Sequence, residues 1–400
     1  MSYDFDAIVV GARCAGSPTA MLLARTGYKV LVVDRAAFPS DTISTHVVHP
    51  TAVAALKRWG LLDRLIATGC PAIDTYMFDF GPIVITGSPG TTESPVAYCP
   101  RRTVLDKILV DAAVDAGAQI YEGFVVDELV TDGDRVTGIR GHRKDGPSVT
   151  ITARVVIGAD GRNSVVAKGV QPVEYNQKPQ FVCAYYSYWR DLPMHGRFET
   201  YARQDHGFAA CETHDGLTMV VGGWPFARFE AQKQDLDAAY LRLFDQAPAF
   251  KAKIEKATRI DKVYGAVTPN AFRKPFGPGW ALVGDAGYIK DPITAQGILD
   301  AFRDAELLAG GLDQVFSGAS TCDDAMAHYQ ATRDAIAMPM YELTAQIASM
   351  APPPPEFQQL LGAVSHNQRA SDDFCRVNAG GLPPPEFFSE ANVGKIFAGV

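Results

Sequence analysis

A strand, a glycine-containing turn, a helix and a second strand follow one another between residues 5 and 34, and this unit constrains the fold more than any other feature. The apolar run Phe5 to Val10 leads into Gly11-Ala12-Arg13-Cys14-Ala15-Gly16. A helical pattern then extends to Gly27, and a second apolar run, Lys29 to Val33, ends at Asp34. This order is typical of a dinucleotide-binding βαβ unit, in which the helix start neutralises a pyrophosphate and the acid accepts from a ribose 2′-hydroxyl. The sequence therefore predicts an α/β fold with a Rossmann-like domain. Its candidate cofactor-binding residues are Gly11, Arg13, Cys14, Ala15, Gly16, Asp34 and Arg35.

This first turn departs from the usual glycine pattern at one position. The middle glycine, which lets the backbone approach a phosphate, is Arg13. We expect Arg13 to turn outward and to add positive charge near the pyrophosphate. The alternative is a βαβ unit that holds no ligand.

A second strand-turn-helix stretch lies far along the chain. The apolar run Trp280 to Val283 stops at Gly284-Asp285, an irregular turn containing Pro292 follows, and apolar residues recur at helical spacing after Gln296-Gly297. A helix start there would present free N–H groups and its positive end to a ligand. For a flavin, this end would stabilise the negative charge gained on reduction, and Asp285 would accept from ribityl hydroxyls. The alternative is an ordinary strand-turn-helix of an α/β domain.

Two further segments follow the same logic. The buried strand predicted over Val149 to Gly158 ends in Ala159-Asp160-Gly161. Arg102 stands at the start of an amphipathic helix and faces away from its apolar stripe, which suits contact with a phosphate or a flavin edge. A solvated arginine is the alternative. His46 and His49, in the polar loop before the Thr51 helix, are interpreted as solvated, although a place near the cofactor stays open.

The rest of the chain predicts a second domain and a helical end. Short alternating strands fill residues 74–96 and 177–267, and Phe181 to Trp189 alternates with Tyr186 and Tyr188 on one face. Such a sheet is either a lid over an aromatic or apolar ligand or simply core. We predict a discontinuous cofactor domain (1–73, 97–176 and 268–330), a β-sheet substrate domain (74–96 and 177–267) and a C-terminal helical region (331–400). The proline runs at 352–355 and 383–385 are interpreted as turns or a docked tail.

Composition excludes several classes of partner. The chain is 47% hydrophobic and 20% charged, with a net charge of −8 and no run of Lys and Arg, so nucleic acid is not expected. No apolar segment is long enough to span a bilayer, and the acidic N-terminus does not resemble a signal peptide. Seven scattered cysteines predict reduced thiols, a cytoplasmic location and no metal site.

With these motifs placed, the chain over residues 5–310 resembles the flavoprotein monooxygenase superfamily of p-hydroxybenzoate hydroxylase, whose relatives include geranylgeranyl reductases and flavin-dependent halogenases. The resemblance implies a glutathione-reductase-type FAD domain with an inserted substrate domain. It assigns Gly11, Gly16 and Asp34 to the ADP half of FAD and Arg102 to an FAD contact. It further assigns Asp160 and Gly161 to FAD and nicotinamide nucleotide binding, Gly284 and Asp285 to the ribityl chain, Pro292 to the side of the ring, and Gln296 and Gly297 to its pyrimidine edge.

The same resemblance implies a function. NADH or NADPH would reduce FAD, O₂ would add as a C4a-hydroperoxide, and oxygen would pass to an aromatic or other apolar small molecule bound by a monomer or homodimer. Candidate catalytic residues, as proton relays for a phenolic substrate, are Tyr186, Tyr188, Tyr201 and His206. Tyr288 replaces the usual histidine, and neither the W-x-W-x-I-P signature of halogenases nor a clear Y-x-W-x-F-P signature of reductases is present. The alternatives are a reductase of carbon–carbon bonds, a flavin-dependent halogenase and a flavin carrier without turnover.

Overall fold

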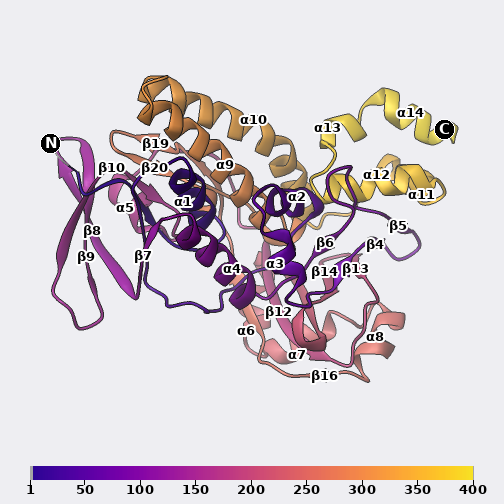
Figure 1. Cartoon of the computed structure of the whole chain (residues 1–400). Helices are drawn as coiled ribbons and strands as arrows, with labels where there is room; N and C mark the ends of the chain where they lie inside the picture. The colour runs from indigo at the N-terminus through magenta and orange to yellow at the C-terminus, as the bar shows by residue number, and fades with distance from the viewer. Residues whose placement is uncertain (1–2, 400) are drawn as a thin grey trace.

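The computed structural model describes residues 3–399 and contains two large sheets (Figure 1). The first sheet has the order β19-β20-β10-β1-β2-β7. These strands are β19 (Phe276–Gly277), β20 (Trp280–Leu282), β10 (Val149–Gly158), β1 (Phe5–Val10), β2 (Val30–Asp34) and β7 (Gln119–Glu122). The strands from β20 to β7 are parallel to one another, and the apolar β1 and β2 are buried, as expected where both faces of a parallel sheet are covered.

The register of this sheet aligns the ends of four strands. Val10 pairs with Gly158 and Val33, and Gly158 pairs with Leu282. The residues that follow β1, β10 and β20, and the last residue of β2, therefore lie at one edge. Ligands of open α/β sheets bind at this carboxyl edge.

Helices cover one face of the first sheet, and a smaller antiparallel extension covers the other. The first face is covered by α1 (Gly16–Arg25), α4 (Arg102–Asp115) and α9 (Gly297–Phe316), with α2 (Pro50–Arg58) and α3 (Leu62–Ile66) beside them. The second face is covered by β8 (Phe124–Asp132), β9 (Arg135–Arg143) and α5 (Val165–Val170). Two small sheets lie outside the large ones. One pairs β3 (Ala72–Ile73) with β6 (Ala97–Tyr98), and the other has the order β11 (Glu174–Lys178), β18 (Asn270–Arg273) and β21 (Tyr288–Ile289).

The second sheet unites two separated segments of the chain. Its order is β16-β12-β15-β14-β13-β4-β5, with β17 on β12, and β4 pairs with β13 in parallel. The strands are β4 (Thr75–Asp79), β5 (Val84–Gly87), β12 (Val182–Arg190), β13 (Arg197–Arg203), β14 (His206–Glu212), β15 (Leu217–Pro225), β16 (Thr258–Arg259) and β17 (Tyr264–Val267). The two segments predicted as the substrate domain therefore share one sheet. The division of the chain into a cofactor domain, a substrate domain and a C-terminal region stays a prediction.

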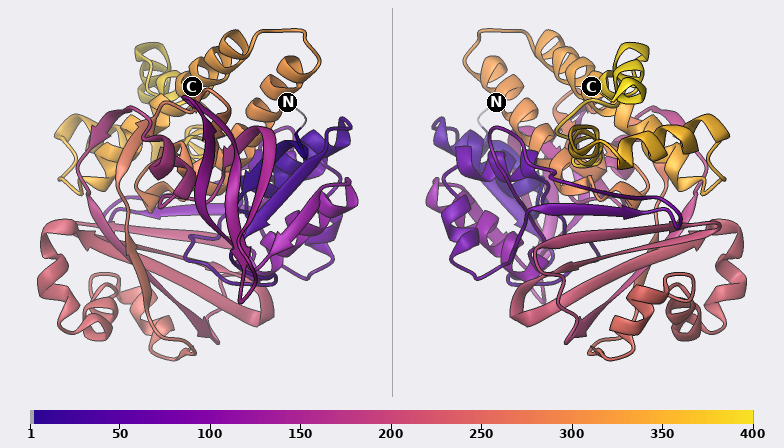
Figure 2. Two further views of the ribbon diagram at one scale, coloured as in Figure 1. Left: turned by 90° about the vertical axis from the view of Figure 1, so that its left-hand side faces the viewer. Right: turned by 90° about the vertical axis from the view of Figure 1, so that its right-hand side faces the viewer.

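Side chains alternate between the two faces of β12 as the sequence predicts. Tyr186 and Tyr188 pack with the C-terminal helices, whereas Cys183, Tyr185 and Trp189 pack with the opposite cluster. The opposite face is covered by α6 (Phe229–Lys233), α7 (Leu236–Arg242) and α8 (Pro248–Ile254), and Figure 2 shows the sheet as a layer between these helices and the C-terminal ones.

The C-terminal region is helical, as predicted. Helix α10 (Cys322–Ala348) begins before residue 331 and crosses from the first sheet toward α11 (Pro355–Ser365), α12 (Gln368–Asn378), α13 (Pro384–Phe387) and α14 (Glu390–Ala398) (Figure 1). Pro355 and Pro384 stand at the first positions of their helices, where no N–H donor is needed. Of the helices within residues 3–399, none is both long and apolar enough to cross a bilayer.

Candidate functional site

Two glycines of the first turn allow an approach that no side chain would permit. Gly11 has φ +103°, and a Cβ there would lie 2.5 Å from the carbonyl oxygen of Ala159. A Cβ on Gly16 would lie 1.8 Å from the carbonyl oxygen of Gly11. The turn after β1 therefore packs directly on the residues that follow β10, and only glycine fits there.

The distant Gly284 turn reaches the same place. Gly284 has φ +58°, and a Cβ added to it would lie 2.8 Å from the Cβ of Ala15. Three of the four segments singled out in the sequence, after β1, β10 and β20, thus meet at the carboxyl edge of the first sheet.

Asp34 ties the first turn to the end of β2. Its Oδ2 accepts from the N–H of Ala12 and its Oδ1 from that of Ala36, both at 2.8 Å. Each carboxylate oxygen keeps a second lone pair, which suits a ribose hydroxyl. Arg35, the next residue, is exposed.

Arg13 does not turn freely outward. Its Nη1 lies 2.6 Å from Oδ2 of Asp106, and its Nη2 donates to the Oγ of Ser40 at 2.7 Å. The fully buried Asp106 carboxylate requires a cation and holds the guanidinium in place. Positive charge near the predicted pyrophosphate is therefore present but fixed.

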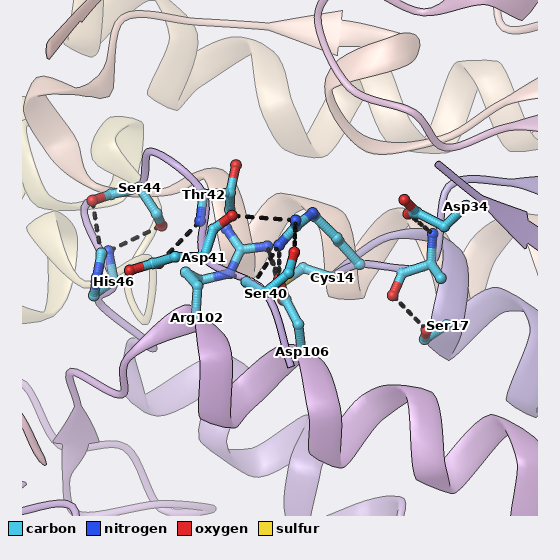
Figure 3. A network of polar contacts seen from close by, with 12 residues as sticks. Cys14, Ser17, Asp34, Ser40, Asp41, Thr42, Ser44, His46, Arg102 and Asp106 are labelled. Carbon is cyan, nitrogen blue, oxygen red and sulfur yellow. Dashed lines mark hydrogen bonds and ion pairs between the residues drawn. The ribbon is translucent and has the colours of Figure 1, made fainter. Parts of the chain in front are cut away.

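Asp106 is a site residue that the sequence analysis missed. It also accepts from Arg102 Nε at 2.9 Å and Nη2 at 2.8 Å, and the Cys14 thiol donates to it at 3.4 Å (Figure 3). Two arginines on one carboxylate leave this cluster of three side chains with one net positive charge. The available signal was the aspartate four residues after Arg102, the spacing of an ion pair on a helix.

Arg102 is buried, so the alternative of a solvated arginine is wrong. Its Nε and Nη2 bond Asp106, whereas Nη1 has no hydrogen-bond partner among residues 3–399. This free donor suits a phosphate or a flavin edge.

The segment after β10 also carries unused polar groups. Oδ2 of Asp160 accepts from the N–H of Val165 at 2.6 Å, but its buried Oδ1 has no partner within the described part of the chain. Burial raises the pKa of Asp160. Gly161 has φ +77° with open space where a Cβ would stand.

Asp285 is exposed although many protein atoms surround it. Desolvation by these surrounding atoms is the largest cause that raises the pKa of Asp285 to about 6, and repulsion from the charge of Asp300 is the next. No hydrogen-bond partner for its carboxylate is found between residues 3 and 399. Gly297 opens α9 nearby in sequence, is exposed and has open space around it, whereas the Gln296 side chain donates to the carbonyl of Asn378 at 2.7 Å. The unpaired groups of Arg102, Asp160 and Asp285 fit FAD, whose ribityl, phosphate and ring groups need such partners.

A cavity of about 1060 Å³ lies next to this edge, against the second sheet. Pro292 to Ala295 form one part of its wall. The other parts come from the loop at Thr45 to His49, from β4 and β12–β15, and from the C-terminal helices. Pro352–Pro354 and Pro384–Pro385 also border it, so the proline runs are part of the cavity wall rather than only turns of a docked tail.

The four candidate catalytic residues do not form one group. The Tyr188 hydroxyl lies 2.6 Å from His46 Nε2, and the Tyr186 ring is 5.6 Å from that imidazole. The Tyr201 hydroxyl instead donates to Glu199 at 2.8 Å, and its ring packs toward α8.

His206 borders the cavity with a lowered pKa, because burial disfavours its charged form. Its buried Nε2 has no partner in the described chain.

His46 and His49 are buried, so their interpretation as solvated loop residues was wrong. His46 Nδ1 donates to the carbonyl of Ser44 at 2.7 Å, which leaves Nε2 to accept from Tyr188. His49 Nδ1 lies 2.7 Å from the Tyr76 hydroxyl and Nε2 lies 3.3 Å from the carbonyl of Thr294. Burial lowers both pKa values to about 4, so both imidazoles are uncharged at neutral pH.

Comparison with known proteins places this geometry in context. The family described as "FAD binding domain" matches residues 4–344. A tryptophan 2-halogenase of Chondromyces crocatus is 24% identical over 81% of this chain and 64% of its own length, so the chain spans less than two thirds of that relative. A digeranylgeranylglycerophospholipid reductase of Methanothrix thermoacetophila is 28% identical over 83% of each chain.

Solved structures share the fold over nearly the whole length. The myxobacterial chondrochloren halogenase CndH is 24% identical with a TM-score of 0.81, over 95% of this chain and 98% of that one. The p-nitrophenol 4-monooxygenase PnpA of Pseudomonas putida DLL-E4 is 18% identical with a TM-score of 0.77, over 96% and 100%.

Proposed function

This chain belongs to the FAD binding domain family and is an FAD-dependent oxidoreductase, and we propose that it is a monooxygenase that uses NADH or NADPH and O₂ to hydroxylate an apolar small molecule. The observation that carries the proposal is the cavity of about 1060 Å³ bordered by the Pro292 to Ala295 turn. The resemblance puts the flavin ring at this turn. A reacting carbon held in the cavity would therefore face the ring.

We assign a different part of the cofactor to each group of residues at the edge of the first sheet. Asp34 and the helix start at Gly16 would hold the ADP half, Arg102 and Asp160 the middle, and Asp285 the ribityl chain. The start of α9 at Gly297 would hold the pyrimidine edge. Bound there, FAD would supply electron transfer from NAD(P)H and the activation of O₂.

The remaining task of the protein is to orient the substrate and exclude water. The wall contains apolar side chains of β12, β14 and β15, and the C-terminal helices close the side away from the sheet. Burial raises the pKa of Tyr186 to about 12 and that of Tyr188 further, so both hydroxyls keep their protons at neutral pH. Tyr188, bonded to His46, therefore holds a proton rather than accepting one from a phenol.

Isotope incorporation tests the proposal directly. Purified, FAD-loaded enzyme is incubated with NADPH or NADH, ¹⁸O₂ and a panel of apolar compounds, and products are analysed by mass spectrometry. We expect one ¹⁸O atom in the product. Product formed without ¹⁸O, or NAD(P)H oxidation that yields only hydrogen peroxide with every compound, would contradict the proposal.

A second candidate is a reductase of carbon–carbon double bonds. It is supported by the alignment with the reductase over 83% of each chain and by the large apolar cavity. Anaerobic turnover with a reduced product would establish this candidate in place of the first. Strict dependence on chloride or bromide would instead indicate a halogenase.

We also propose a cytoplasmic location and a monomeric or homodimeric state. All seven cysteines are free thiols, and six of them are buried, as expected in a reducing compartment.

A further inference from the structure

The cavity is larger than a one-ring substrate requires. Ala184 of β12 and Ala209 of β14 lie on its sheet side, and Phe357, Phe374 and Phe388 of the C-terminal region also border it. Its volume, about 1060 Å³, is at the upper end of the range of about 300–1000 Å³ for small-molecule pockets. A single aromatic ring would leave most of this space unfilled, so the walls fit a longer or polycyclic molecule.

The charged side chains at the cavity are already paired. Arg203 Nη2 lies 2.9 Å from Asp79 Oδ1, and its other nitrogens donate to the carbonyls of Asp79, Ala202 and Gln246. Glu342 lies 2.9 Å from Lys178 Nζ. Arg203 and Glu342 are the only Lys, Arg, Asp or Glu among the described residues that border the cavity. A carboxylate or phosphate inside it would therefore be desolvated without a free cation.

The polar groups nearest the Pro292 to Ala295 turn are likewise satisfied. His49 and Tyr76 are buried and bond each other at 2.7 Å, and Thr294 Oγ1 lies 2.9 Å from Thr344 Oγ1. These side chains are therefore already bonded to one another and offer no unpaired group to the reacting part of a ligand.

From these three observations, and resting on the proposed function of the same site, we propose that the substrate is a neutral, extended apolar molecule and that anionic analogues are excluded. The chemical class comprises long-chain or polycyclic hydrocarbons with at most uncharged polar groups. Chain length contributes to binding, because each buried CH₂ adds about fourfold in affinity.

Displacement of neutral Nile red from the FAD-loaded protein tests this class. The probes are dodecan-1-ol, hexan-1-ol and dodecanoate at pH 8. We expect the inhibition constant of dodecan-1-ol to be at least about a hundredfold lower than that of hexan-1-ol. We expect the inhibition constant of dodecanoate to be at least about tenfold higher than that of dodecan-1-ol. Equal affinity of alcohol and carboxylate would overturn the proposal.

Two variants at the cavity, and one control variant away from it, locate the effect. Ala184→Phe fills space at the sheet and is expected to lower the affinity for dodecan-1-ol about tenfold. Ala231→Phe, at an exposed position of α6 away from the cavity, is expected to leave this affinity unchanged. Asp79→Asn keeps an acceptor for the N–H of Gly81 but removes the countercharge of Arg203. This variant is expected to raise the affinity for dodecanoate about tenfold without changing the affinity for dodecan-1-ol. Unchanged dodecanoate affinity in this folded variant would contradict the charge argument.

These measurements are independent of turnover. Binding of neutral long-chain probes without ¹⁸O incorporation would leave this inference standing and remove the proposed monooxygenase. Incorporation of ¹⁸O into a small anionic substrate, with no binding of dodecan-1-ol, would support the proposed monooxygenase and overturn this inference.

Discussion

At the scale of single residues, Asp106 organises the edge of the first sheet. Its fully buried carboxylate fixes Arg13 at 2.6 Å and Arg102 at 2.8 Å, and these two guanidinium groups come from different elements. One carboxylate thereby joins the first glycine turn to the start of α4. The positions of both arginines at the proposed cofactor site depend on this residue, although we do not assign it a contact with FAD.

Replacing Asp106 with Asn leaves two buried or partly buried arginines without a countercharge. We expect the free energy of unfolding to fall by about 3 kcal/mol, because breaking a buried ion pair leaves an uncompensated charge. We also expect FAD to bind at least about tenfold more weakly, because Arg13 and Arg102 lose their fixed positions. Urea denaturation and titration with FAD measure the two effects.

Glu93→Gln is the matched control. Glu93 pairs with Arg58 at 3.1 Å, but both side chains are exposed, so the change is expected to stay within about 0.5 kcal/mol and to leave FAD affinity unaltered. Equal losses in the two variants would contradict a special role for Asp106.

His49 predicts a pH dependence of stability. Its pKa is lowered from 6.5 to about 4 by burial and by the charge of Lys290, against an opposing effect of Asp300, so the folded state disfavours the imidazolium. The stability that neutral His49 contributes is fully present above pH 6.5 and is lost as the pH falls toward 4. His49→Gln removes this dependence. Between pH 6.5 and pH 4, the unfolding free energy of the variant should therefore fall by about 3 kcal/mol less than that of the parent protein. Parallel curves for the two proteins in urea denaturation would show that His49 does not titrate this way.

At the scale of elements, the glycine turn between β1 and α1 is the most constrained piece of backbone. Gly16→Ala places a Cβ 1.8 Å from the carbonyl of Gly11, so the turn must open away from Ala159. We expect FAD binding to be lost and the unfolding free energy to fall by about 2–4 kcal/mol. Gly310→Ala, inside α9 with open space around it, should instead be neutral or stabilising by up to about 1 kcal/mol. Retained FAD affinity in Gly16→Ala would contradict the close approach of these segments.

Individual elements were largely predictable because their signals are local. The strand predicted over Val149 to Gly158 is β10 with the same bounds, and the alternation of β12 assigns Tyr186 and Tyr188 to the correct common face. The period of apolar residues decides these features within a few positions. The resemblance assigned the first turn and the Gly284 turn to one cofactor, and the two turns do meet at the carboxyl edge of the first sheet.

Contacts between distant elements were not predictable from such signals. His46 bonds Tyr188, 142 residues away, so nothing near it in sequence distinguishes a buried histidine from a solvated one. Arg13 was expected to face outward, but it is held by Asp106, a residue of α4 that lies 93 positions further along the chain. The proline runs border the cavity only because the C-terminal helices fold back onto the second sheet.

At the scale of the whole molecule, the two sheets perform different tasks. The carboxyl edge of the first sheet gathers unpaired polar groups and the two arginines bound to Asp106. One face of the second sheet and the C-terminal helices enclose a mostly apolar cavity. The Gly284 to Gly297 segment connects them, since it contacts the first turn at Ala15 and borders the cavity at Pro292. This arrangement suits a cofactor that is held by one sheet and reacts with a molecule held by the other.

The most direct test of this account is a titration of the purified, cofactor-free chain with FAD, followed by visible absorption and by the quenching of flavin fluorescence. The account predicts saturable binding of one FAD per chain, with affinity reduced at least about tenfold in Asp106→Asn and unchanged in Glu93→Gln. A folded protein that is colourless after incubation with FAD and removal of the unbound FAD by gel filtration would contradict it.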